Sequence, residues 1–364
     1  MNDELSSKIS KVKQLLAEHT LDALLVQRVT NFAWLTCGGA SYINTAEESG
    51  AASLLITPSG RYLITNNIEA PRFQQEEKLE QQGWKFEVFQ WYQSTDVLND
   101  ITKDQRLATD GLYHHGKDIN NELIRLRADL LPAEQDRFRE LSRGCAQAMN
   151  AAVESIQPGM TEYEISAILA QETHRREILP IVNLIATDQR IYSFRHPLPT
   201  AKKLERYAML VLCGRKNGLV ASITRLVHFG FLPDEIFRKS EAVATIDATF
   251  IAATHPGQSL ADIFKIAQTK YAEVGFPDEW QLHHQGGPAG YMPREAIATA
   301  HEDWVVRAGQ AFAWNPSITG TKSEDTILVK EDGFENMTEI SGWPEIKVEL
   351  DNQVISRPAI LVVT

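Results

Sequence analysis

Residues 283–295 combine side chains that can transfer protons and bind anions with glycines that let a ligand approach the backbone. Two imidazoles, an amide, a phenol, a guanidinium and a carboxylate stand among three glycines and two prolines, a composition that rules out a regular helix. A polar surface loop is the plain alternative. Loops held by a rigid scaffold often carry binding sites, however, so we predict a glycine-lined site here.

The composition limits what kind of protein surrounds this site. A chain of 364 residues, 43% hydrophobic and 23% charged, is long enough for two globular domains. Its formal net charge of -12 argues against a nucleic-acid partner, and no apolar run is long enough to predict a membrane span. The charged amino terminus is unlike a secretory signal, and three scattered cysteines suit a reducing compartment. We therefore expect a cytoplasmic protein.

The first part of the chain alternates short apolar runs with turns. Leu5, Val12 and Leu16 have helical spacing within a predicted helix over 5–18. A second helix is expected near 69–81, and residues 31–35 are interpreted as a helical turn. This alternation predicts an α/β domain over residues 1–131. The expected strands are 21–26, 52–56, 61–64, 86–89 and 105–109.

The second part, residues 132–364, contains a sequence feature that occurs twice. After a long amphipathic helix over 134–156, Thr161 and Glu164 form a capping box preceded by Pro-Gly. Ser259 and Asp262, again preceded by Pro-Gly, recur 98 residues later. One recurrence at this distance favours a duplicated half-domain. Together with strands expected at 208–213, 219–227, 311–315 and 325–329, it predicts an α+β domain with two related halves.

At these positions the sequence resembles a known family. The segment NGLVASITR (residues 217–225) and residues 323–333 are similar to motifs of the creatinase/prolidase/methionine-aminopeptidase family. Residues 134–340 resemble its "pita-bread" domain, which has two pseudo-symmetric halves. Residues 5–130 resemble its amino-terminal creatinase-type domain. The resemblance therefore implies this architecture for nearly the whole chain.

The metallopeptidases of that family hold two metal ions with two aspartates, a histidine and two glutamates. By resemblance, only the last of these five ligands, Glu324, is kept here. Hard divalent ions need several anionic or imidazole ligands, so the sequence predicts no metal and no other cofactor. The four remaining ligand positions fall on Val211, Ser222, Gly287 and Asn315.

The metal-free creatinase branch is then the implied parallel. Tyr291-Met292-Pro293-Arg294-Glu295 resembles its active-site segment, and His196 stands at the position of its catalytic histidine. We expect His196 to act as general base and acid, with Glu324 orienting it or a water molecule. Its neighbour Asp325 should face the opposite side of the strand. The residues expected to bind substrate are Arg294, His283, His284, Tyr291, Asn315, Ser222 and Thr224.

These expectations define a metal-independent creatinase-like hydrolase that cleaves a C–N bond of a small carboxylate-bearing metabolite. Hydrolysis, elimination and isomerisation all remain open at this point. The alternatives are a catalytically inactive peptidase-fold binding protein and an Xaa-Pro-type metallopeptidase with atypical ligands. The expected partner is a small anionic molecule. The resemblance to creatinase also implies a homodimer in which the amino-terminal domain of one chain closes the pocket of the other. The loop over 34–44 supports this, because its glycine and aromatic content is typical of a lid or interface.

Overall fold

The computed structural model describes residues 2–93, 97–113, 115–350 and 353–364. The chain divides into two compact units, Met1–Glu134 and Gln135–Thr364, which are described separately. Within the described residues, no helix is both long and apolar enough to cross a bilayer.

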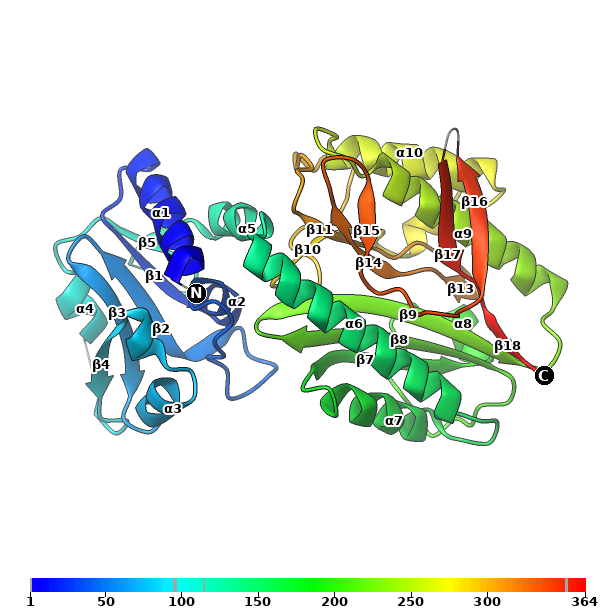
Figure 1. Cartoon of the computed structure of the whole chain (residues 1–364), viewed down its shortest axis with the longest axis horizontal. Coiled ribbons are helices and arrows are strands. Elements are labelled where there is room, and N and C mark those ends of the chain that lie inside the picture. Colours follow the sequence, from blue (N-terminus) through cyan, green and yellow to red (C-terminus); the bar gives the residue numbers. More distant parts are fainter. Residues whose placement is uncertain (1, 94–96, 114, 351–352) are drawn as a thin grey trace. The chain divides into compact units, whose positions relative to one another are not determined.

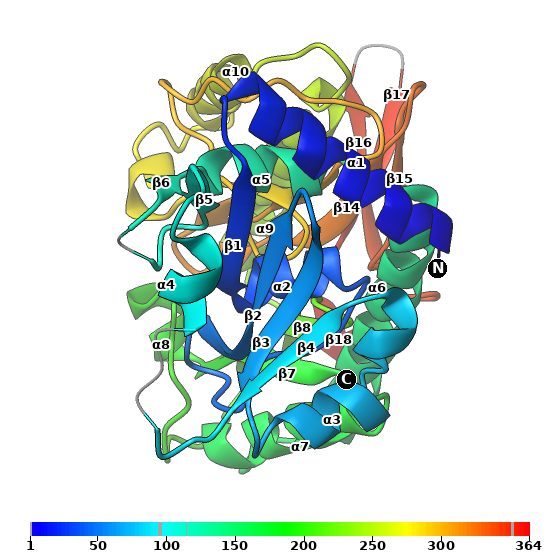
Figure 2. The ribbon, with the colours of Figure 1, turned by 90° about the vertical axis from the view of Figure 1, so that its left-hand side faces the viewer.

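Unit 1 is built on one mixed sheet with the strand order β4-β3-β2-β1-β5-β6 (Figure 2). Strands β1, β2 and β3 pair antiparallel, while β3–β4, β1–β5 and β5–β6 are parallel pairs. The central strand β1 is almost wholly buried, as its continuous apolar sequence predicts. The strands are β1 (Ala23–Arg28), β2 (Ser49–Thr57), β3 (Gly60–Asn66), β4 (Lys85–Phe89), β5 (Leu107–Thr109) and β6 (Lys117–Asp118).

The helices of unit 1 differ from the predicted ones in one place and agree with them in another. The helix expected near 69–81 is broken in two, because Lys78 has a positive φ of 53° that a helix does not allow. The helical turn predicted at 31–35 is confirmed in α2. Trp34, also assigned to the covering loop, is 1% exposed there, so its ring belongs to the core of this unit. The helices are α1 (Asn2–Glu18), α2 (Val29–Leu35), α3 (Ala70–Gln75), η1 (Leu79–Gln82), α4 (Val97–Thr102) and α5 (Asn120–Ala128).

Unit 2 contains two main sheets, with the strand orders β18-β9-β8-β7 and β10-β11-β14-β15. The β8–β9 hairpin turns at Asn217-Gly218, where both residues have positive φ, as predicted for this dipeptide. A single bridge between Thr224 and Glu324 joins β9 to the chain just before β14. The strands of the first sheet are β7 (Leu179–Thr187), β8 (Tyr207–Lys216), β9 (Leu219–Phe229) and β18 (Leu361–Val363).

The second sheet carries the stretch that the sequence singled out. Residues predicted there as an irregular loop form the buried strand β10, which pairs with β11. The strands of this sheet are β10 (Gly286–Ala289), β11 (Ala311–Trp314), β14 (Asp325–Val329) and β15 (Phe334–Asn336). Two small hairpins complete unit 2: β12 (Ser317–Ile318) with β13 (Thr321–Lys322), and β16 (Glu345–Leu350) with β17 (Gln353–Pro358).

The predicted duplication is confirmed in the two helix starts. Thr161 accepts a hydrogen bond from the backbone of Glu164, and Ser259 accepts one from the backbone of Asp262. The preceding Gly159 and Gly257 have φ of 96° and 90°, and each donates its N–H to a distant chain segment. Both halves therefore fold the same local sequence in the same way.

The helices of unit 2 lie against these sheets (Figure 1). Helix α6 packs on β8, where Gly214 leaves space for the Cys145 thiol, and α7 packs on β7. Helices α9 and α10 pack on each other. The predicted order of an α/β unit followed by an α+β unit with two related halves is confirmed. The helices are α6 (Pro132–Ser155), α7 (Glu162–His174), α8 (Gln189–Ser193), α9 (Asp234–Ala253), α10 (Leu260–Glu273) and η2 (Glu279–Leu282).

Candidate functional site

Three histidines from distant parts of unit 2 meet at one point. The Nε2 atoms of His196 and His283 are 3.1 Å apart, and the rings of His283 and His284 stack with centroids 4.4 Å apart. One nitrogen from each of the three rings lies within 4.8 Å of the others. His196 is exposed, His284 is half-buried and His283 is buried, so the cluster is open on the His196 side.

The close approach of two backbone segments fixes His283 and His284 at the start of β10. A Cβ atom on Gly286 would lie 2.2 Å from the carbonyl oxygen of Ala313, so only glycine lets β10 pair with β11 here. The buried Gln285 accepts a 2.8 Å hydrogen bond from the Tyr271 hydroxyl and donates to the His283 carbonyl. The two imidazoles therefore stand on a rigid strand end.

His196 lies on the loop after α8, which a buried carboxylate holds in place. Glu162, the first residue of α7, accepts hydrogen bonds from the backbone and hydroxyl of Thr200 at 2.9 and 2.7 Å. It also pairs with Arg190, which donates to the carbonyl of Leu198 at 3.0 Å. These contacts fasten the chain on the carboxyl side of His196. Glu162 is thus a positioning residue that the sequence analysis did not single out.

Changing Glu162 to glutamine should destabilise unit 2 in a pH-dependent way. Burial alone would raise the pKa of Glu162, but hydrogen bonds from Arg190, Thr200 and Thr187 outweigh it and lower the pKa below 4.5. A carboxyl whose pKa is lower in the folded state stabilises the fold above the unfolded-state pKa and loses this effect as the pH falls through the folded-state pKa. The difference in unfolding free energy between wild type and variant should therefore be largest above about pH 5 and shrink towards pH 3.

Urea unfolding at several pH values, followed by tryptophan fluorescence, measures this difference. The exposed Glu154 on α6 provides a matched control, and Glu154→Gln should change the unfolding free energy little at any pH. A difference between wild type and Glu162→Gln that stays constant with pH would contradict the role assigned to this carboxylate.

Next to the histidines, a buried carboxylate lies between two cations. One oxygen of Glu324 is 2.8 Å from Nη2 of Arg294, and the other is 2.8 Å from Nζ of Lys322. Thr224 donates its hydroxyl proton to Glu324, and Nη1 of Arg294 donates to the Ser222 hydroxyl at 3.1 Å. All three charged side chains are less than a tenth exposed. This group, which we call the Glu324 ion group, has a formal charge of +1.

The Glu324 ion group and burial together control the protonation of the histidines. Burial raises the pKa of Glu324, but Lys322 and Arg294 outweigh it and hold that pKa well below its usual range. Burial and the Lys322 charge lower the pKa of His283 to about 2. Burial and the Arg294 charge lower the pKa of His284 to about 4, and burial lowers that of His196. At neutral pH the site therefore contains neutral imidazoles and an ionised Glu324.

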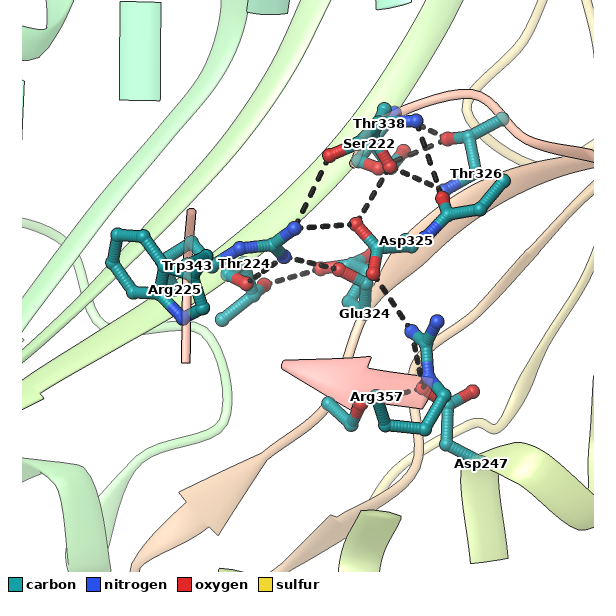
Figure 3. Close-up of polar contacts among 12 residues, drawn as sticks. Ser222, Thr224, Arg225, Asp247, Glu324, Asp325, Thr326, Thr338, Trp343 and Arg357 are labelled. Atoms are coloured by element: carbon teal, nitrogen blue, oxygen red, sulfur yellow. Dashed lines mark hydrogen bonds and ion pairs between the residues drawn. The ribbon is translucent and has the colours of Figure 1, made fainter. Parts of the chain in front are cut away.

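A second charged layer surrounds Asp325, the neighbour of Glu324 in the chain (Figure 3). Its charged partners differ from those of Glu324, as the alternation of the two acids predicted. Asp325 binds Nη2 of Arg225 at 2.9 Å and Nη2 of Arg357 at 2.8 Å. Arg357 also binds Asp247, which accepts a hydrogen bond from Ser323. All of these charged side chains are almost completely buried. The layer fixes the strand that presents Glu324.

The five positions at which the family resemblance implies metal ligands do not form a dinuclear site. Val211 is packed among apolar side chains, and a Cβ on Gly287 would lie 2.3 Å from the Ala296 carbonyl oxygen. The Ser222 hydroxyl and both oxygens of Glu324 are occupied by Arg294 and Lys322. Fixed side-chain cations therefore contact two of the five positions, and the donor set does not fit two metal ions.

Two further residues predicted to bind substrate, Asn315 and Tyr291, are both buried. Asn315 is buried next to β11, and within the described chain its Oδ1 accepts no hydrogen bond. Tyr291 is 1% exposed, and its backbone N–H donates to Glu295 at 2.8 Å. The sequence reasoning missed Lys322. Since side chains two apart in extended backbone share a face, its spacing from Glu324 was a usable signal.

Comparison with known proteins agrees with this architecture. Residues 136–331 match the model of metallopeptidase family M24, and residues 8–134 match the creatinase/prolidase N-terminal domain. The sequence is 21% identical to an Xaa-Pro dipeptidase of Pyrococcus horikoshii over 354 residues, which are 92% of this chain and 98% of the relative. It is 25% identical to an uncharacterized peptidase of Staphylococcus haemolyticus, over 65% of this chain and 70% of that protein.

Solved structures show the same fold. The prolidase from Pyrococcus horikoshii OT3 superposes with a TM-score of 0.79 at 18% identity, covering 92% of this chain and 99% of that one. The N-terminal domain of the FACT complex subunit SPT16 from chickpea superposes with a TM-score of 0.70 at 12% identity, covering 94% and 97%. The two-unit architecture is that of an amino-terminal creatinase-type domain followed by a pita-bread domain. The chain belongs to metallopeptidase family M24.

The comparisons overturn the function predicted from the sequence. The prediction of a metal-independent creatinase-like hydrolase is wrong, because the named relatives and structural neighbours are Xaa-Pro dipeptidases and prolidases. The loss of four of the family's five ligand positions had left a metallopeptidase only as an alternative. The findings favour the second alternative, an Xaa-Pro-type metallopeptidase with atypical ligands.

Proposed function

We propose that this protein is a peptidase that hydrolyses short peptides of the Xaa-Pro type, using a site with an atypical set of ligands. The observation that carries the proposal is the cluster of three neutral imidazoles beside the Glu324 ion group, in a chain that belongs to metallopeptidase family M24. The names of the relatives supply the substrate class: the Pyrococcus horikoshii relative is an Xaa-Pro dipeptidase.

The charges of the site support a substrate with a free carboxylate. Lys322 and Arg294 carry two positive charges against the single negative charge of Glu324, so the group keeps one positive charge next to the histidines. Local charge, and not the net charge of -12, governs the binding of a small ligand. A dipeptide places its carboxylate close to the bond that is cleaved. We therefore propose that the ion group attracts the dipeptide carboxylate and that the imidazoles face the scissile amide.

Release of proline tests the proposal. The full chain is incubated with Ala-Pro, with Ala-Pro amide and with Pro-Ala, each with and without added Zn²⁺, Co²⁺ or Mn²⁺. We expect proline release from Ala-Pro, much less hydrolysis of the amide, which lacks the carboxylate, and none of Pro-Ala. His196→Ala supplies the background, since this exposed side chain can be removed without opening the core. Release from Ala-Pro no faster than in that variant would reject the proposal.

A specific observation favours a second candidate, a peptidase-fold binding protein without catalysis. Arg294 and Lys322 contact the Ser222 and Glu324 side chains, two of the five positions at which the family resemblance implies metal ligands. A protein of this kind would be stabilised against heat by Xaa-Pro dipeptides without cleaving them, and an Arg294→Lys variant would be stabilised less because lysine lacks the two-pronged guanidinium. Thermal shift and proline release, measured on the same samples, separate the two candidates.

The expected partners also stay proposals. A homodimer would give a mass near 82 kDa, about twice the 40.9 kDa of the chain, in sedimentation at micromolar concentration. The buried Trp34 removes one reason for assigning the covering role to residues 34–44, so this experiment tests the dimer and not that loop.

A further inference from the structure

We infer that His196, His283 and His284 form a binding site for a single transition-metal ion, at a place where the family resemblance implies no ligand set. One nitrogen from each ring lies within 4.8 Å of the others. Among the described residues, this is the group of three histidine, cysteine or acidic side chains whose ligand atoms lie close enough together to hold one metal ion. This inference adds a metal ion to the proposed peptidase site. Only the part that the ion would take in hydrolysis rests on the proposed function.

The distances suit a tetrahedral ion. Zinc–nitrogen bonds of about 2.0–2.1 Å in a tetrahedron place two ligand nitrogens roughly 3.3–3.4 Å apart. The His196 and His283 Nε2 atoms, at 3.1 Å, already have nearly this separation. The widest separation in the cluster, at most 4.8 Å, has to close by about 1.5 Å. His196 is exposed on a loop, so its side chain can make this movement without disturbing the core.

Hydrogen bonding within the cluster does not account for all of its nitrogens. One imidazole can donate to another across the His196–His283 contact, but that uses one nitrogen of each ring. Within the part of the chain that the structure describes, Nδ1 of His283 and Nδ1 of His284 are buried and have no hydrogen-bond partner. Buried polar atoms are almost always paired, so two neighbouring exceptions within one cluster indicate a ligand or an ordered water.

The charges next to the cluster also act on a bound cation. Lys322 and Arg294 repel a metal ion, but Glu324 lies between them and compensates for one of their two positive charges.

The donor atoms select the kind of ion. Three imidazoles without a carboxylate suit Zn²⁺, Co²⁺, Ni²⁺ or Cu²⁺, whereas Mg²⁺ and Ca²⁺ prefer oxygen ligands. Glu324 cannot contribute, since both of its oxygens are bound to Arg294 and Lys322. Three protein ligands leave a fourth tetrahedral position for water or a substrate atom, which is the arrangement of catalytic and not of structural zinc sites. The predicted site is therefore mononuclear and selective for imidazole-binding ions.

Titration of the metal-free full chain tests this inference without any substrate. The protein, freed of any affinity tag and of metal by a chelator, is titrated calorimetrically with Zn²⁺ and, separately, with Mg²⁺. We expect one equivalent of Zn²⁺ to bind with a dissociation constant of roughly 1 µM or lower, and no Mg²⁺ binding. Co²⁺ should produce the intense visible absorption of tetrahedral coordination by nitrogen.

Variants show where the ion binds. His196→Ala and His284→Ala should each weaken Zn²⁺ binding at least 100-fold, while His255→Ala, an exposed histidine on the turn before α10, should leave it unchanged. Circular dichroism and the unfolding midpoint show whether each variant is folded. Because His196 is exposed, His196→Ala is the variant least expected to disturb folding. Absent Zn²⁺ binding, or binding that survives both substitutions within the cluster, overturns the inference.

The outcome is separable from that of the proposed function. Stoichiometric Zn²⁺ at the histidines without proline release would leave the metal site standing and reject the peptidase. Proline release by chelator-treated protein that binds no Zn²⁺ would support the peptidase and reject the metal site.

Discussion

Replacing Arg357 with methionine is expected to lower the free energy of unfolding by about 3–5 kcal/mol. The Arg357 side chain is 1% exposed and lies between two carboxylates, 2.7 Å from Asp247 and 2.8 Å from Asp325. Methionine fills similar space but leaves both carboxylates without this cation in a region that excludes water. Removing one partner of a buried ion pair has this large effect because the remaining charge cannot be solvated.

The same variant should show a distinctive pH dependence. In the wild type, burial raises the pKa of Asp247 even though Arg357 opposes this effect. Without Arg357 the Asp247 carboxylate can escape the unfavourable charge by taking up a proton, so the loss of stability should diminish as the pH is lowered. Urea unfolding of the full chain at several pH values measures both effects.

A surface ion pair supplies the control for this experiment. Arg139 binds Glu335 at 3.0 Å, but the two side chains are 30% and 28% exposed. Arg139→Met should therefore lower the unfolding free energy by less than about 1 kcal/mol. Equal losses in Arg139→Met and Arg357→Met would show that burial of the Asp247–Arg357–Asp325 group has no special effect.

Substituting Gly286 with alanine should lower the unfolding free energy by about 2–5 kcal/mol and displace the histidines. Its φ of 102° is unfavourable for any side chain, and the new methyl group would meet the backbone of β11, 2.2 Å from the Ala313 oxygen. Because the neighbours are backbone atoms, the strand itself must move. His283 and His284, directly before this strand, would move with it.

Gly257→Ala separates these two effects. Gly257 has a similar φ of 90°, but a Cβ atom there has nothing within 4 Å. This variant should lose only about 1–2 kcal/mol, the cost of the left-handed backbone conformation. NMR titration of the histidine ring protons in both variants reports on the site, and we expect altered histidine signals in Gly286→Ala alone. Unaltered signals in Gly286→Ala would mean that β10 does not position the imidazoles.

Local sequence rules predicted the parts of the fold that depend on local interactions. Asn217-Gly218 favours a tight hairpin because both residues tolerate a positive φ, and the Thr161 and Ser259 caps each depend on residues only three positions away. The same rules failed at Lys78, since nothing in the composition of 69–81 reveals one residue with a left-handed backbone. The helical turn predicted at 31–35 is confirmed in α2, but the glycine and aromatic content of 34–44 did not show that the ring of Trp34 is buried.

The candidate site was predictable only one residue at a time. His196 and His283 were each selected, yet nothing in the sequence shows that side chains 87 positions apart have their nitrogens 3.1 Å from each other. Arg294 and Glu324 were assigned separate roles, substrate binding and catalysis, whereas in the fold they bind each other. Long-range pairing of this kind depends on the register of strands that come together only in the folded sheet.

The wrong prediction of function has a related cause. The sequence was compared with one set of ligand positions, and their loss was taken as the loss of any metal site. Three histidines from two loops form a different set of candidate metal ligands, and no fixed spacing in the sequence predicts this set. The loss of a family's ligands therefore argues against that arrangement of metals and not against metal binding by other side chains.

The charged layer around Asp325 has a consequence for how unit 2 unfolds. Its members come from α9, β9, β14 and β17. The two most distant members, Arg225 and Arg357, are 132 positions apart in the sequence. None of these segments can detach by itself without leaving a charge unpaired in the interior, so partial opening is nearly as unfavourable as complete unfolding. Backbone amides of all four segments should therefore exchange with solvent hydrogen at similar, slow rates, through a single cooperative opening.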